Sequence, residues 1–209
     1  MVMIVERIKE THSGFQPTNA QVGTHLINNQ NWVNSDVQAS FDIQHDGTSI
    51  YLHYFVKEDH VRAVNSGFNS SVWEDSCAEF FFMLKGDGEN YYNFEINAVG
   101  TVLGGYGKER NDRTWLPDTA LEKIETLPSL GREPFGDIHE TTLWTLQVRI
   151  PITTLCFSEI KDITGQDAFG NFYKCGDMLK QPHFLSWKPV LIPDPDFHQS
   201  RYFGQLSFL

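Results

Sequence analysis

The chain reads DVQASFDIQHDGTSIYLHYFV from Asp36 to Val56, and this stretch decides the fold. Apolar and polar residues alternate in its first half, which is the two-residue period of a strand with one buried face. The HDGT sequence at 45–48 carries turn-forming residues. A second alternating run then places its apolar side chains at Ile50, Leu52, Tyr54 and Val56. The stretch therefore predicts a β-hairpin.

The same alternation predicts later strands over residues 76–84, 91–97, 144–150 and 201–208. Pro151 ends the third of these, because proline cannot donate to a strand ladder. We expect a short helical turn at 152–156, but no amphipathic helix of three or more turns. Short strands joined by turns and long loops are typical of an all-β, antiparallel β-sandwich of the jelly-roll or immunoglobulin-like type.

Length predicts one domain over residues 1–209, since 209 residues can bury a sizeable core. Residues 1–35 are interpreted as an irregular lead-in with a strand and a turn. Residues 58–75 form a polar connection. The Gly-, Pro- and charge-rich stretch 104–140 is interpreted as a loop inside the domain. Loops of this kind commonly carry function on a rigid sheet.

The net charge is −11, from 16 Lys and Arg against 27 Asp and Glu, and the basic residues form no run. Such a surface repels phosphate backbones and anionic membranes, so we expect neither as a partner. No segment is long and apolar enough to span a bilayer. Residues 1–5 lack the pattern of a signal peptide, which leaves a cytoplasmic protein or an exported one whose leader has been removed.

Cysteines and metal-ligating residues give weak signals. Cys77, Cys156 and Cys175 are too few for a disulfide framework, and we interpret each as a small buried apolar side chain. The eight histidines show no zinc-binding pattern. Calcium could bind to the carboxylates of Asp194 and Asp196, or of Asp46 and Asp59.

A carbohydrate-binding site is indicated by aromatic and polar residues at the loop–strand boundary near residue 75. Trp73 and Glu74 lie where a long loop enters a strand, and Asn93, Glu95 and Asn97 share one face of the neighbouring strand. Sugars present apolar C–H faces and a rim of hydroxyls, which suit an aromatic ring beside carboxylates and amides. The alternatives are that Trp73 caps the core and that the polar strand face meets a metal or solvent.

A second aromatic group lies near the carboxyl end. Prolines stiffen the loop after Trp187 and before Phe197, so these rings would be held at fixed angles. A ring from this loop could close a clamp on a sugar with Trp73. Ordinary hydrophobic packing is the alternative.

The chain resembles the family 9 carbohydrate-binding modules, and in particular their bacterial relatives, in a series of motifs that occur in the same order along the sequence. The motifs are Trp73-Glu74-Asp75-Ser76-x-x-Glu79-Phe80-Phe81, Tyr92-x-Phe94-Glu95-x-Asn97-x-x-Gly100, Trp144-x-Leu146-x-Val148-x-Ile150-Pro151, Phe172-Tyr173-Lys174-Cys175-Gly176-Asp177, His183-Phe184-Leu185-Ser186-Trp187, Pro195-Asp196-Phe197-His198 and Phe203-Gly204-x-Leu206-x-Phe208.

The resemblance implies a β-sandwich related to the DOMON superfamily, structural calcium, and a sugar held between two tryptophans. By position these are Trp187 and either Trp73 or a nearby ring, and Glu74 matches the family's acid before the Asp-Ser pair. The family's arginine, which comes two residues before an asparagine on the next strand, is absent from residues 93–97.

Three functions follow as hypotheses. The leading one is non-catalytic binding of a mono- or oligosaccharide in the service of polysaccharide breakdown. The second is a glycoside hydrolase that uses Glu79 and Glu95, since glycosidases place two carboxylates across the scissile bond. The third is a haem-binding domain of the DOMON type, with candidate ligands at Met83, Met178, His183 and His198.

Overall fold

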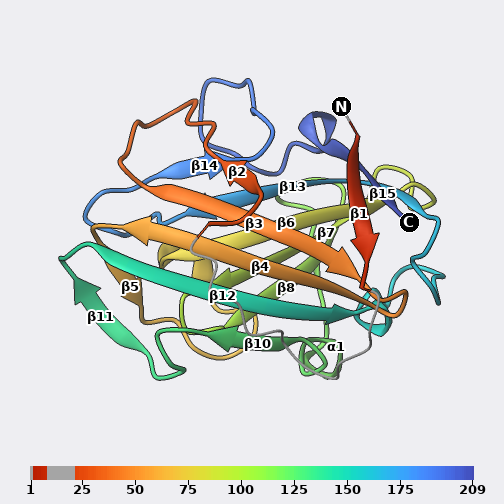
Figure 1. The fold of residues 1–209 in the computed structure, drawn as a ribbon, viewed down its shortest axis with the longest axis horizontal. Coiled ribbons are helices and arrows are strands. Elements are labelled where there is room, and N and C mark those ends of the chain that lie inside the picture. Colours follow the sequence, from red (N-terminus) through yellow and green to blue (C-terminus); the bar gives the residue numbers. More distant parts are fainter. Residues whose placement is uncertain (1, 9–21) are drawn as a thin grey trace.

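The computed structural model, which describes residues 2–8 and 22–209, contains the hairpin predicted from residues 36–56 (Figure 1). Strands β3 (Gln38–His45) and β4 (Ser49–Glu58) are antiparallel neighbours. In the turn between them, Asp46 Oδ1 accepts hydrogen bonds from the backbone nitrogens of Thr48 and Ser49. Gly47 has a φ of +96°, a conformation that a residue with a Cβ rarely adopts.

The strands form two sheets that continue into each other. The first sheet contains, in spatial order, β10 (Glu125–Pro128), β12 (Thr142–Pro151), β4 and β3, with β2 (His25–Ile27) also beside β3. The second contains, in order, β15 (Gly204–Phe208), β13 (Asp167–Cys175), β6 (Cys77–Leu84), β7 (Tyr91–Asn97), β8 (Val102–Gly107) and β9 (Thr114–Trp115), with β14 (Phe184–Ser186) also beside β13. Strand β1 (Met3–Arg7) joins them, because it pairs in parallel with β15 and with β3.

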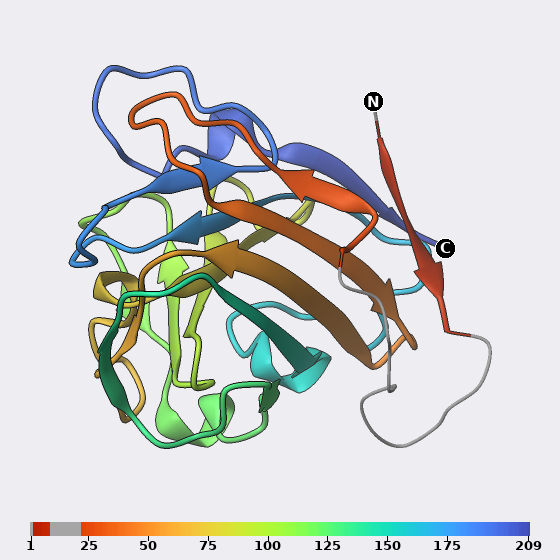
Figure 2. The same cartoon turned by 60° about the vertical axis from the view of Figure 1, so that its left-hand side comes forward.

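This arrangement is the β-sandwich that the alternation predicted. In Figure 2 the orange strands β3 and β4 pass in front of the yellow-green strands of the second sheet. The remaining elements are β5 (Val61–Ala63) paired with β11 (Phe135–Ile138), the helix α1 (Asp118–Leu121), and the 3-10 turns η1 (Val72–Glu74), η2 (Ile152–Thr154) and η3 (Ser200–Tyr202). No helix in the described part of the chain is long and apolar enough to cross a membrane.

The core fills the space between the two sheets. Phe172 stacks on Phe41 of the first sheet and on Phe80 of the second. Its ring centroid lies 3.7 Å from that of Phe41 and 4.7 Å from that of Phe80. All three rings are fully buried. Each contributes about 1.5–3 kcal/mol by leaving water. These contacts confirm the apolar faces that alternation predicted for β3 and β6.

The lead-in is more regular than predicted. We expected an irregular segment over residues 1–35 with one strand, whereas both β1 and β2 lie within it, and β1 connects the two sheets. Residues 1 and 9–21 of that prediction lie outside the described part of the chain. The stretch 104–140 is likewise not only loop, because it contains β9, β10, β11 and α1.

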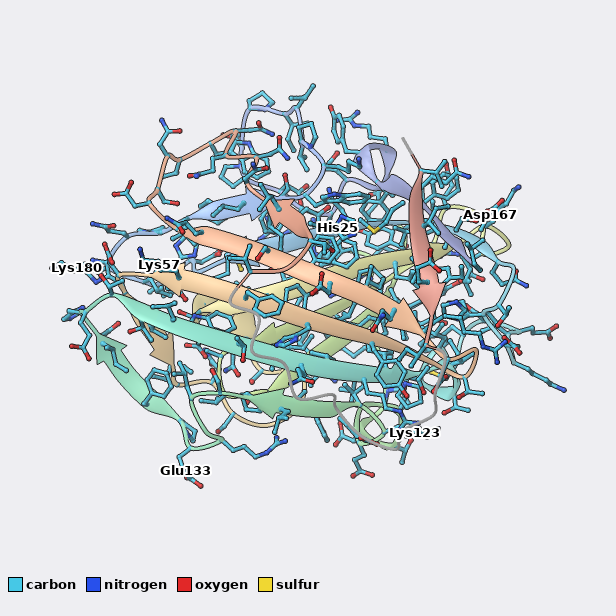
Figure 3. All side chains as sticks on the ribbon, in the orientation of Figure 1. His25, Lys57, Lys123, Glu133, Asp167 and Lys180 are labelled. Carbon is cyan, nitrogen blue, oxygen red and sulfur yellow. The ribbon has the colours of Figure 1, made fainter. Side chains whose placement is uncertain are left out.

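The second sheet is buried on its outer face as well as its inner face. Every residue of β7 is buried. On the outer face, Phe81, Tyr91 and Tyr173 pack with Phe197 from the 187–199 loop. Charged side chains such as the labelled Lys123, Glu133 and Lys180 instead extend outward from the molecule (Figure 3). Polar groups on the covered face of the second sheet therefore need partners, since burial without them is costly.

The close approach of β13 to β6 gives a test of this packing. A Cβ added at Gly170 would lie 2.7 Å from the backbone oxygen of Phe81. We expect Gly170→Ala to lower the free energy of unfolding by about 1–3 kcal/mol, because backbone cannot move aside cheaply. Urea denaturation measures this change. The control is Gly86→Ala, where an added Cβ meets nothing within 4 Å. Equal stabilities of the two variants would contradict the described strand packing.

Candidate functional site

A pocket of about 200 Å³ lies on the outer face of the second sheet. Strands β6, β7 and β13 provide its floor, and loops provide its walls. The residues that carry its chemistry are Trp73, Glu79, Asn93, Glu95, Arg113, Trp115, Cys175, Asp177, Asp196 and His198. Three of the six site residues predicted from the sequence, namely Trp73, Asn93 and Glu95, are brought together here.

Trp73 forms one wall and is held by its backbone. It lies in η1, directly after the fully buried Val72. Its carbonyl oxygen accepts a hydrogen bond from the backbone nitrogen of Asp177 at 3.1 Å and lies 3.6 Å from Cys175 Sγ. These contacts hold the backbone of Trp73 against the end of β13. Its side chain is only partly buried and lines the pocket.

Asn97 supports this wall but does not line the pocket. Its Nδ2 donates to the carboxylate of Asp75 at 3.0 Å and to the backbone oxygen of Asn65 at 2.9 Å. Asp75 also accepts from the backbone nitrogens of Val64 and Asn65. These bonds tie the connection that carries η1 to the end of β7.

Glu74, the neighbour of Trp73, also lies outside the pocket lining. Its side chain is half-buried, and its backbone oxygen accepts a hydrogen bond from Met178. Its carboxylate lies close enough to Asp177 to help raise the pKa of that group. The acid that the resemblance singled out thus lies beside the site.

The pocket floor is a pair of buried carboxyl groups. Glu79 and Glu95 are register partners on β6 and β7, and they are 2% and 5% exposed. Burial raises the pKa of Glu95 to about 7, although a hydrogen bond from Asn93 Nδ2 at 2.9 Å opposes the rise. Burial and the Glu95 charge raise the pKa of Glu79 well above its ordinary value. Near neutral pH the floor therefore offers hydrogen-bond donors as well as acceptors.

Arg113 brings a guanidinium to this floor from the connection between β8 and β9. It donates to the backbone oxygens of Gly107 and Tyr91 at 2.7 Å and 3.0 Å, and to the Asn93 side chain. Its guanidinium carbon also lies 4.4 Å from the centroid of the Tyr91 ring. β7 itself carries no arginine, and Arg113 reaches Asn93 from another segment.

Aromatic side chains from two further segments complete the walls. Trp115 of β9 lines the pocket and is 50% exposed. Phe197 lines it from the last long loop and stacks on Tyr173 with centroids 4.1 Å apart. His198 lies next to it, and its Nδ1 is 2.9 Å from the Tyr91 hydroxyl. Burial lowers the pKa of His198 to about 3, so its ring is neutral near neutral pH.

Sequence reasoning missed Arg113 and Trp115. Both lie in the 104–140 stretch, whose only signal was its composition as an inserted loop. Nothing local to those residues indicates that they fold back over β7.

Trp187 is not part of this pocket. Its ring packs edge-on against Phe172 and Phe41, with centroids 5.7 Å and 6.1 Å away. Lys188 Nζ lies 4.0 Å from the ring centroid. Gly204 leaves room for the indole, because a Cβ there would be 2.6 Å from it. The structure therefore does not bring Trp73 and Trp187 to one pocket.

Three of the four aspartates considered for calcium, all but Asp194, already accept hydrogen bonds. Both Asp46 oxygens do so, one from the Tyr51 hydroxyl. Asp59 accepts from Thr141, and Asp196 accepts from the backbone nitrogen of His198. Structural calcium remains a prediction.

The two histidines considered for haem have partners in the protein. Nε2 of His183 lies 2.7 Å from Lys174 Nζ, and His198 contacts Tyr91 as described. Of the two candidate methionines, Met83 is half-buried on β6 and Met178 is exposed. Haem binding also remains a prediction.

The fold is a β-sandwich with an aromatic-walled, polar-floored pocket on one sheet. Residues 16–208 match the model of the family described as carbohydrate-binding family 9. The chain therefore belongs to carbohydrate-binding family 9. Carbohydrate binding is the function that this membership supports.

Solved structures agree with this assignment. A proposed carbohydrate-binding protein from Bacteroides uniformis is 36% identical over 100% of this chain and 99% of its own, with a TM-score of 0.91. Family 9 modules from Caldicellulosiruptor kristjanssonii in complex with glucose and with cellotriose share the fold at 13% and 12% identity. Their TM-scores are 0.56 and 0.58, over 100% of this chain and 96% and 93% of theirs. No significant match was found among curated proteins.

Proposed function

We propose that the pocket on the second sheet binds a sugar ring between indole walls and a polar floor, without transforming it. The observation that carries the proposal is the convergence of Trp73 and Trp115 on a hollow floored by Asn93 and Glu95. Family membership and the glucose and cellotriose complexes of the Caldicellulosiruptor kristjanssonii modules support a sugar as the ligand.

The chemistry of the pocket suits a sugar on both of its sides. The indoles offer apolar faces on which sugar C–H groups stack. The floor presents the carboxyl groups of Glu95 and Asp177 and the amide of Asn93, which can donate to and accept from hydroxyls. A hydroxyl that pairs with these buried groups is strongly selected, because a ligand without it leaves them unpaired.

The size of the pocket favours a single sugar unit. A volume of about 200 Å³ is below the roughly 300–1,000 Å³ of typical small-molecule sites. A monosaccharide, or one residue of an oligosaccharide, is the ligand we propose. We further propose that this binding serves polysaccharide breakdown by holding the protein at its substrate.

Glycoside hydrolysis by Glu79 and Glu95 is the second candidate, and one observation favours it. The two carboxyl groups are register partners with raised pKa values, a pattern that occurs in catalytic acid pairs. An assay for new reducing ends in the binding mixtures separates binding from hydrolysis. We expect none.

Titration calorimetry against glucose, galactose, xylose and cellotriose tests the proposed function. For the best ligand we expect Trp115→Ala to weaken binding about fivefold, because an exposed ring contributes about 1 kcal/mol by stacking. The matched control is Leu143→Ala, which removes an exposed apolar side chain from β12 in the first sheet. Unchanged affinity in Trp115→Ala, or equal losses of affinity in both variants, would contradict the proposal that Trp115 contacts the sugar.

A further inference from the structure

A cluster of two thiols and a carboxyl group lies at the base of the pocket. Cys77 and Glu79 are two residues apart on β6, so they share a face, and Cys175 is the register partner of Cys77 on β13. All three are buried, at 0%, 2% and 0% exposure. Their Sγ and carboxylate oxygen atoms lie within 4.8 Å of one another.

The contacts inside the cluster are close. The Cys175 thiol donates to Glu79 Oε1 at 2.9 Å. Strand register fixes the three side chains before any ligand arrives, because neighbouring β6 and β13 pair over eight consecutive positions. Glu79 and Cys175 also line the pocket, so the cluster has an entry path from solvent.

We propose that Cys77, Glu79 and Cys175 form a binding site for a zinc-type divalent cation at the base of the pocket. Two sulfurs and one carboxylate oxygen match the ligand preferences of a borderline-soft cation, and calcium takes oxygen ligands instead. Three protein ligands leave the fourth tetrahedral position for water or a hydroxyl from the pocket. The site shares Glu79 and Cys175 with the lining of the pocket, but its test does not depend on sugar binding.

The proton balance of metal binding is consistent with the site. Each metal–ligand bond replaces a proton on a thiol or carboxyl group, so binding to the fully protonated cluster releases three protons. Two thiolates and one carboxylate around a divalent cation leave one net negative charge. Lys174 Nζ lies 2.7 Å from the backbone oxygen of Cys175, but its charge is already paired with Glu58 at 2.9 Å. Without metal, burial raises the pKa of Cys77 to about 12, which keeps that thiol protonated.

A disulfide between Cys77 and Cys175 is the competing outcome, since the two residues are opposite each other on paired strands. A disulfide would explain why the two sulfur atoms are close, but not why Glu79 lies beside them. Oxidation would remove the thiol proton that Cys175 donates to the buried Glu79 carboxyl, whereas a cation engages all three groups.

Cobalt titration of the full-length, reduced, metal-free protein tests the site. We expect a thiolate-to-cobalt charge-transfer band and tetrahedral visible bands that saturate at one equivalent of Co²⁺ and vanish when Zn²⁺ is added. We also expect Zn²⁺ to raise the melting temperature. A reduced protein that binds no Co²⁺, or one whose Cys77 and Cys175 persist as a disulfide after reduction, would overturn the proposal.

Variants assign the ligands. Loss of an outer-shell partner typically weakens metal binding 10–100-fold, so we expect Cys77→Ser and Cys175→Ser to weaken it by about 100-fold or more. Glu79→Gln keeps the shape of the side chain, and we expect a loss of about tenfold with the charge-transfer band retained. The matched control is Cys156→Ser, because Cys156 is exposed and lies outside the cluster.

Circular dichroism of the metal-free variants shows whether each variant is folded, and so separates loss of a ligand from loss of the fold. If a buried serine prevents folding, the cobalt spectra of Glu79→Gln and Cys156→Ser still test the assignment. Cobalt bands that survive unchanged in Glu79→Gln and in a folded Cys175→Ser, or that disappear in Cys156→Ser, would contradict the assignment.

Discussion

Sugar affinity is expected to fall about 30- to 150-fold when Trp73 is replaced by alanine. This is the range for losing a central, well-packed tryptophan from a binding site, about 2–3 kcal/mol. Trp73 is such a residue because its backbone is bonded to Asp177, just after β13, and because it lines the pocket together with the buried carboxyl groups. The loss exceeds that expected for Trp115, whose side chain remains half exposed. Titration calorimetry with the best sugar measures it.

Trp187→Phe is the matched control for that experiment. Trp187 packs against Phe41 and Phe172 and lies outside the pocket, so phenylalanine preserves an aromatic contact without touching the site. We expect its sugar affinity to stay within about twofold of wild type. If Trp187→Phe weakens binding as much as Trp73→Ala does, the two-tryptophan clamp predicted from the sequence is correct and the pocket described here is not the sugar site.

The second large effect concerns stability, and it arises from a buried ion pair between the sheets. Lys174 Nζ lies 2.9 Å from Glu58 Oε2, and both side chains are almost completely buried. Trp144 Nε1 donates to the other Glu58 oxygen at 2.7 Å. Burial and the Lys174 charge lower the pKa of His183 well below its ordinary value, so His183 is neutral beside the pair. Lys174 therefore supplies the positive charge that compensates Glu58.

Lys174→Met is expected to lower the free energy of unfolding by about 3–5 kcal/mol, because it leaves a buried carboxylate uncompensated. Urea denaturation at neutral pH measures the change. The double variant Glu58→Gln with Lys174→Met removes both charges, and we expect it to recover much of the loss. A loss below about 1 kcal/mol in the single variant, or no recovery in the double variant, would contradict this account of the pair.

Three of the strands that the sequence identified share one physical property. On β3, β4 and β12, one face meets the core and the other is more polar, so hydrophobicity alternates along the chain. β13 escaped detection because its buried polar residues Asn171 and Lys174 lie on opposite faces, so hydrophobicity does not alternate along it. β7 is also covered on both faces, but it was predicted because its polar residues Asn93, Glu95 and Asn97 share one face. In β13, only the tertiary partner Glu58 explains the buried lysine.

The candidate site was predictable to the extent that it lies on regular strands. Asn93 and Glu95 were placed on one face by strand period alone, and Trp73 by its position at the entry to β6. Arg113 and Trp115 reach the pocket through a long connection, and local periodicity carries no information about where such a segment folds. Trp187 was assigned by motif order, whereas its location in the fold is set by packing against Phe172.

A crystal structure of the protein with its best-binding sugar tests the central claim most directly. We expect the sugar ring to lie against the Trp73 indole in the pocket on the second sheet, with hydroxyls bonded to the Glu95 carboxyl and the Asn93 amide. A sugar ordered beside Trp187, or on any face away from β6 and β7 while this pocket holds only water, would contradict it.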